Sequence, residues 1–113
     1  MSHDFEQQKA ETLAVFAELA DGAELPDEIN VDYAFLPGAS ANWDAVLAAL
    51  DQAGYDCQQT EPEPEDGPGA VAQLIATLPD QPVSALAIWT GEEIATRIAL
   101  DHGFTPDGWG FWA

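Results

Sequence analysis

The sequence predicts an α+β protein of the ferredoxin-like class, a βαββαβ sandwich preceded by one added helix at its N-terminus. Two observations predict it. Apolar residues recur at helical spacing in some segments and alternate with polar residues in others. These segments follow the order helix, strand, helix, strand, strand, helix, strand. We therefore expect a four-stranded, mostly antiparallel sheet with one face buried under helices, within a single domain over residues 1–113.

An apolar stripe predicts the first helix over residues 5–20, inside an N-terminal segment 1–22. The stripe consists of Leu13, Phe16, Ala17 and Ala20. Gly22 would end this helix, because glycine readily adopts the left-handed conformation of a C-cap. Residues 29–36 alternate apolar and polar side chains and so predict a strand, which Pro37-Gly38 ends.

Ser40 or Asn42 would cap the second helix, which closes at Gly54. Its apolar face is formed by Trp43, Val46, Leu47 and Leu50. Residues 55–59 are a short candidate strand. Residues 60–69 are rich in Glu, Pro and Gly, which predicts an acidic loop.

Residues 70–78 predict a central strand, and residues 105–112 predict the last strand. Two interpretations remain for the segment between them. The favoured one is a long helix ending near His102, capped by Asp80 with Pro82 in its first turn. Its apolar stripe would be Val83, Ala87, Thr90, Ile94 and Ile98, with Glu93 and Arg97 paired on the surface. The alternative makes residues 83–89 a strand, because Gly91 costs about 1 kcal/mol inside a helix.

The balance of acidic and basic residues limits the classes of partner that this protein can bind. Lys9 and Arg97 are the only basic side chains among 21 Asp and Glu residues, which gives a formal net charge of −19. Such a field repels nucleic acids and anionic membranes and attracts basic protein surfaces. A purely solvating role of the acids is the alternative. Cys57 is the only cysteine, and no signal peptide or membrane-spanning run is evident, so we expect a cytoplasmic protein.

Catalytic and metal-binding patterns are weak. His3 and His102 are the only candidate histidine bases, and His102 is expected to lie at a helix end. Cys57 has no basic neighbour in sequence that would lower its pKa. The alternating Glu61, Glu63 and Glu65 are separated by prolines and lack an EF-hand pattern. We therefore expect neither an enzyme nor a bound cofactor or metal.

Partner binding is the remaining role, and two segments are candidates for it. One is the acidic loop, and the other is the aromatic C-terminus, where Trp109 and Phe111 share one strand face and Trp112 takes the other. The candidate residues are Glu61, Glu63, Glu65, Asp66, Asp107, Gly108, Trp109, Gly110 and Trp112.

The C-terminal third carries a family resemblance. From Ala85 through Gly103-Phe104 to Asp107-Gly108-Trp109-Gly110, the chain resembles the regulator of ribonuclease activity B family. Asp21-Gly22 after the first helix and the Gly54-Tyr55 pair are also similar, whereas Pro106 stands where that family usually has Tyr. The resemblance implies an acidic, non-enzymatic, ferredoxin-like inhibitor of ribonuclease E that binds the enzyme or its scaffold region.

Two other functions remain open at this point. One is an immunity or antitoxin-like protein that caps a basic nuclease toxin, which would use the same electrostatics. The other is a small-ligand-binding ferredoxin-like domain, which would need a pocket with converging polar groups.

Overall fold

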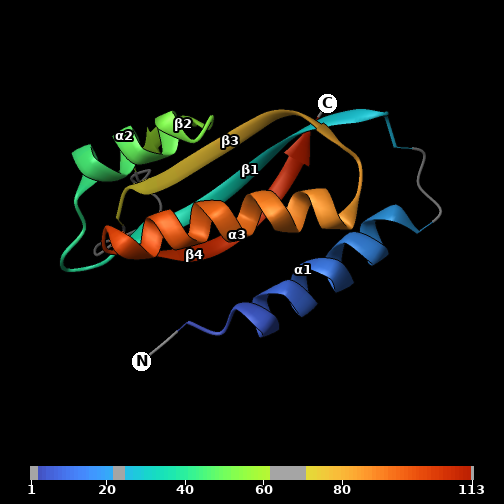
Figure 1. Cartoon of the computed structure of the whole chain (residues 1–113), viewed down its shortest axis with the longest axis horizontal. Coiled ribbons are helices and arrows are strands. Elements are labelled where there is room, and N and C mark those ends of the chain that lie inside the picture. The colour runs from blue at the N-terminus through green and yellow to red at the C-terminus, as the bar shows by residue number, and fades with distance from the viewer. Residues whose placement is uncertain (1–2, 22–24, 62–70, 113) are drawn as a thin grey trace.

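The architecture was obtained as a computed structural model that describes residues 3–21, 25–61 and 71–112. The elements are α1 (Phe5–Ala20), β1 (Glu28–Pro37), α2 (Trp43–Gln52), β2 (Asp56–Thr60), β3 (Gln73–Pro82), α3 (Ala85–Asp101) and β4 (Phe104–Trp112). The strands form one antiparallel sheet of order β2-β3-β1-β4. Helix α3 lies between α2 and α1 (Figure 1). The predicted ferredoxin-like α+β fold with an added N-terminal helix is confirmed.

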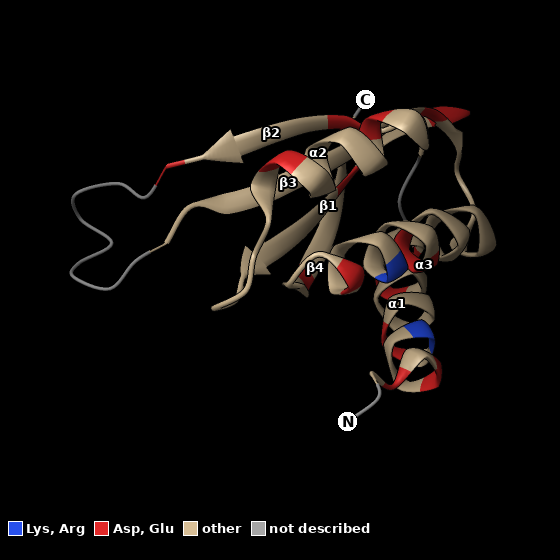
Figure 2. Cartoon of the chain, turned by 60° about the vertical axis from the view of Figure 1, so that its left-hand side comes forward, with Lys and Arg blue, Asp and Glu red and all other residues tan. Residues whose placement is uncertain are grey.

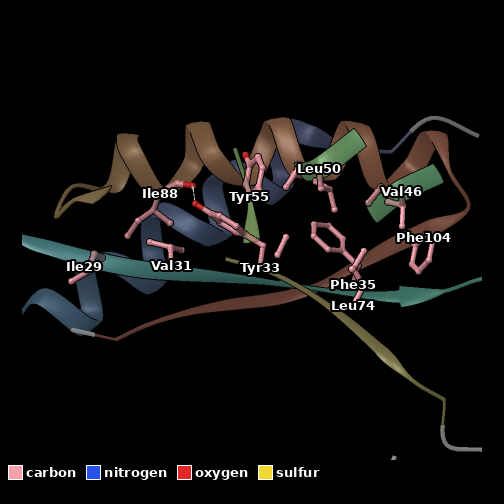
Figure 3. Close-up of a cluster of buried hydrophobic side chains, with 13 residues drawn as sticks. Ile29, Val31, Tyr33, Phe35, Val46, Leu50, Tyr55, Leu74, Ile88 and Phe104 are labelled. Atoms are coloured by element: carbon pink, nitrogen blue, oxygen red, sulfur yellow. Dashed lines mark hydrogen bonds between the residues drawn. The ribbon is translucent and has the colours of Figure 1, made fainter. Parts of the chain in front are cut away.

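The core lies between the sheet and the helices α2 and α3. In β1, alternate residues are buried, as the sequence pattern predicted: Ile29, Val31, Tyr33 and Phe35. Side chains from the other elements meet them in one cluster (Figure 3). Among them are Val46, Leu50, Tyr55, Leu74, Ile88 and Phe104.

Helix α2 follows its prediction closely. Asn42, one of the two predicted caps, accepts a hydrogen bond from the backbone nitrogen of Ala45 at 3.1 Å. Val46 and Leu50 are buried, and Trp43 packs edge-on against Phe104 with ring centroids 4.9 Å apart. The N-cap and the apolar spacing thus determine both the start and the buried face of this helix.

Helix α3 is one long helix, so the strand interpretation of residues 83–89 is wrong. The predicted start is also wrong, because β3 continues to Pro82 and Ser84 is the N-cap. Asp80 has a φ of 57° inside β3, where the pairing with β1 shifts register, and its backbone nitrogen donates to Asn30 Oδ1. An irregular strand therefore occupies the predicted helical turn.

The predicted apolar stripes of α3 and α1 are also wrong in part. In α3, Thr90 and Ile94 are exposed, and the buried face includes Ile88, Gly91, Glu92, Ala95, Thr96 and Ala99. In α1, Ala17 is exposed, whereas the buried residues are Gln8 and Thr12. Both helices bury polar residues at their shared interface, which a search for apolar stripes overlooks.

The sheet order confirms β3 as a central strand, paired with β2 on one side and with β1 on the other. Strands β2 and β4 are the two edges of the sheet. The predicted cap at Gly22 and residues 62–69 of the acidic loop lie outside the described residues.

Candidate functional site

Strand β4 carries most of the predicted partner-binding residues, and a bulge determines which way they point. Pro106 pairs with Phe35 and Trp109 pairs with Tyr33, so Asp107 and Gly108 together oppose the single residue Ala34. Gly108 has a φ of 108°, which glycine adopts without strain. Because of this extra residue, Pro106 and Trp109 both face the helices, although their sequence separation is odd.

The aromatic residues of β4 lie on both faces of the sheet. Trp109 is half-buried on the helix side, where it packs against the core and stacks with Phe111 at a centroid distance of 6.3 Å. Trp112 is 53% exposed on the opposite face, and its indole nitrogen donates to Asp32 Oδ2 at 3.1 Å. The opposite placement that strand alternation predicted is therefore observed.

The remaining predicted site residues are not gathered in one place. Gly110 pairs with Asp32 on the face of the sheet opposite the helices, and Asp107 accepts a hydrogen bond from Gln73 Nε2 at 2.8 Å. Glu61 is exposed just after β2, at the other edge of the sheet from β4. Glu63, Glu65 and Asp66 lie outside the described residues.

Sequence reasoning missed the polar interface between α1 and α3. Gln8 Nε2 donates to Glu92 Oε2 and to Thr96 Oγ1, each at 3.1 Å. Thr12 Oγ1 donates to Glu92 Oε1, and Gln8 Oε1 bonds His3 Nε2 at 2.6 Å. The one available signal was spacing, because Gln8 with Thr12 and Glu92 with Thr96 each lie four residues apart, on one helix face.

Glu92 is the chemically unusual member of this interface. It is only 5% exposed, and burial raises its pKa because desolvation penalises the charged carboxylate. Nearby Glu11 adds to this increase, whereas the hydrogen bonds from Thr12 and Gln8 and the nearby His3 oppose it. The carboxyl group is thus held in a fixed orientation with incomplete charge compensation.

A cavity of about 540 Å³, which we term the α1–β4 groove, opens beside Glu92. Helix α1 and its N-cap contribute Asp4, Gln8, Glu11, Thr12 and Val15 to its lining, and β4 contributes Pro106, Gly108 and Trp109. Asp4 and Glu11 are exposed at its rim, and Val15 is 43% exposed. The groove therefore joins apolar walls to three carboxylates, and it brings together Gly108 and Trp109 of the predicted site with residues that the prediction lacked.

A second cavity, of about 450 Å³, lies beside Tyr55, Leu78 and Gly91. Its lining is mostly apolar, and burial raises the pKa of Tyr55 to about 12. Neither of these two cavities is lined by Cys57 or His102.

Cys57 and His102 occupy structural positions. Burial, with Asp51 and Asp56 nearby, raises the pKa of the Cys57 thiol to about 11, which disfavours the nucleophilic thiolate. His102 is the C-cap of α3, as its predicted place at a helix end required, and its carbonyl accepts from Asn42. Within residues 3–21, 25–61 and 71–112, no three His, Cys, Asp or Glu side chains are grouped closely enough to hold a metal ion.

Acidic residues are spread over the helices and strands, and the two basic residues lie on α1 and α3 (Figure 2). Arg97 is engaged within the chain: it donates to Glu93 Oε2 at 3.0 Å, which confirms the predicted pair, and lies 4.2 Å from the centre of the Phe5 ring. No helix in the described part of the chain has both the length and the apolar character needed to cross a bilayer.

Comparison with known proteins agrees with the resemblance in the C-terminal third and extends it. The profile of the family described as "Regulator of ribonuclease activity B" matches residues 9–111, which covers nearly the whole chain and includes α3 and most of α1 and β4. No curated protein matches the chain. The chain belongs to the regulator of ribonuclease activity B family.

Proposed function

We propose that this protein is a non-enzymatic regulator that binds and inhibits an RNA-processing ribonuclease of the ribonuclease E type. The observation that carries the proposal is the family match over residues 9–111, because it links the whole fold to ribonuclease regulation. The proposed compartment is the cytoplasm, with which a single unpaired cysteine is compatible.

The charge distribution supports a basic region of the ribonuclease as the contact. The chain carries a formal net charge of −19, and Arg97 already has an acidic partner within the chain. RNA-binding segments of nucleases are rich in Arg and Lys, so an acidic protein can occupy them in place of RNA. Opposite charges would also speed the encounter of the two proteins.

The test measures two quantities on the purified proteins: inhibition of RNA cleavage by the ribonuclease, and affinity for its basic region as salt rises from about 0.05 M to about 0.5 M. We expect inhibition, and an affinity that falls at least about ten-fold over this range. An unchanged affinity would exclude electrostatic recognition. Absence of inhibition would exclude the regulatory function itself.

The immunity-like alternative relies on the same acidity, so the same assay separates the two functions. A protein that caps a nuclease toxin would protect cells against that toxin and leave the RNA-processing ribonuclease fully active. Complete activity of the ribonuclease, together with tight binding to a toxin encoded beside this protein, would favour the alternative.

A further inference from the structure

We infer that the α1–β4 groove binds a cationic side chain, arginine or lysine, presented by the basic segment of the partner. The identity of the partner rests on the proposed function, whereas the chemistry of the ligand follows from the groove itself. Its lining combines a buried carboxylate at Glu92, rim carboxylates at Asp4 and Glu11, and the aromatic residue Trp109.

Charge selects a cation. The described lining of the groove contains three carboxylates and neither Lys nor Arg, and its other titratable side chain is His3, whose Nε2 already bonds Gln8 Oε1 at 2.6 Å. Glu92 is fixed by Thr12 and Gln8, and each of its oxygens accepts one of these hydrogen bonds. A carboxylate group has about four acceptor sites, so both oxygens retain capacity for a further donor. A guanidinium or ammonium group would supply both the donors and the opposite charge.

The apolar residues that line the groove favour a ligand side chain with a long aliphatic stem. Val15 and Pro106 present apolar surface, and Trp109 presents an aromatic ring. Arg and Lys bury their methylene stems along such surface and keep the charged head beside polar groups. A cation near the indole gains additional stabilisation from the ring electrons, which Trp provides better than Phe or Tyr. The groove therefore offers a matching surface to each part of the side chain.

The way α1 docks explains why the space exists. Fully buried contacts between α1 and α3 are polar and centre on Gln8 and Thr12, while Val15, one turn further along, remains 43% exposed. Helix α1 is therefore held in place by these hydrogen bonds and by Phe16, which packs against the core, and its side toward β4 stays open. The partner's side chain would enter through this opening, past Asp4 and Glu11.

The first test uses a hexa-arginine peptide as the probe and follows the indole N–H signals of the tryptophans by NMR. We expect the Trp109 signal to shift progressively with peptide concentration, because a cation near the ring changes its environment. Trp112 lies on the opposite face and is the internal control. A Trp109 signal that stays in place, or that shifts less than the Trp112 signal, overturns the inference.

The second test compares matched variants for binding to the ribonuclease. Glu11→Gln removes a rim charge, and Glu18→Gln removes an α1 charge that is also exposed but lies outside the groove. We expect Glu11→Gln to weaken binding roughly three-fold more than Glu18→Gln. Glu92→Gln keeps the shape of the side chain and removes its charge, and it should weaken binding about 10- to 100-fold. Amide spectra of each variant verify that the fold is intact.

The two proposals fail in different ways. If the unmodified protein binds and inhibits the ribonuclease but the groove variants match their control, the groove inference is overturned and the proposed function stands. If the unmodified protein does not bind the ribonuclease, yet hexa-arginine still shifts Trp109, the proposed function is excluded and the cation site stands.

Discussion

A substitution at Gly91 tests how closely α3 packs against the sheet. A Cβ added at this position would lie 2.5 Å from Tyr33 Oη and 3.0 Å from Leu78 Cδ2. Tyr33 cannot easily move away, because its hydroxyl donates to the carbonyl oxygen of Ile88 at 2.8 Å and the residue is 1% exposed. The substitution Gly91→Ala therefore opposes two physical effects, helix propensity and packing.

Helix propensity alone predicts that Gly91→Ala stabilises the protein by about 1 kcal/mol. Overpacking of a tight core costs about 1–3 kcal/mol. Displacing Tyr33 would also leave its buried hydroxyl without a partner, at a cost of about 1–3 kcal/mol. The two packing costs together exceed the gain in helix propensity, so we expect Gly91→Ala to lower the free energy of unfolding by about 1–5 kcal/mol.

Urea denaturation followed by circular dichroism measures this change. The control is a double-mutant cycle with Tyr33→Phe, which removes the oxygen atom nearest to the added methyl group. We expect Gly91→Ala to cost clearly less in the Tyr33→Phe background than in the unmodified protein. A stabilisation of about 1 kcal/mol by Gly91→Ala, or an equal cost in both backgrounds, would refute the packing argument.

Three further predictions concern single residues. Burial raises the pKa of Glu92 in the folded protein above its value in the unfolded chain. The stability that this difference contributes is complete at pH values below the unfolded-state pKa, and it is lost as pH rises through the folded-state pKa. Urea denaturation at several pH values should therefore show Glu92→Gln gaining stability relative to the unmodified protein as pH rises from about 4 to about 8. Trp109→Ala should lower the free energy of unfolding by about 2–3 kcal/mol, below the roughly 3–5 kcal/mol of a fully buried Trp, because this ring is half-buried. With the pKa of its thiol raised to about 11, Cys57 should react with iodoacetamide near pH 8 roughly 100-fold more slowly in the folded than in the urea-unfolded protein.

The elements that the sequence predicted well are those whose signals are local. Alternation in residues 29–36 identified β1 and its buried face, because one side of that strand lines the core. Asn42 and the apolar spacing after it identified α2 in the same way. These signals depend on residues a few positions apart, which a reader of the sequence can see directly.

The failures involve partners far apart in the chain. Gln8 and Thr12 are buried only because Glu92 and Thr96 satisfy them across 80 or more residues. A search for apolar stripes assigns such polar residues to the solvent-exposed face. It therefore predicts the wrong buried face for α1 and for α3. The irregular turn at Asp80 is likewise a product of strand pairing and not of local sequence.

In the candidate site, too, the features that depend on local sequence were predicted, and those that depend on distant partners were not. Trp109 and Trp112 were correctly assigned to opposite faces, since strand alternation beyond Gly108 is regular. The bulge at Asp107 and Gly108 and the docking of α1 created the groove, and neither is visible in the sequence without the pairing register. Sequence reasoning thus found two residues of the groove lining, Gly108 and Trp109, and missed Glu92, for which the four-residue spacing to Thr96 was the one available signal.

Stability alone gives a poor reason for a carboxylate at position 92. Replacing buried ionic groups with well-packed apolar residues is often neutral or stabilising, because the charges no longer have to be desolvated. In a chain with 21 acidic residues and two basic ones, the carboxylate also adds to self-repulsion. These costs are offset if a cation arrives from outside, since the visiting charge is met by a carboxylate already oriented by Thr12 and Gln8. The proposed cation would therefore explain a carboxylate at position 92 in addition to the hydrogen bonds that it accepts from Thr12 and Gln8.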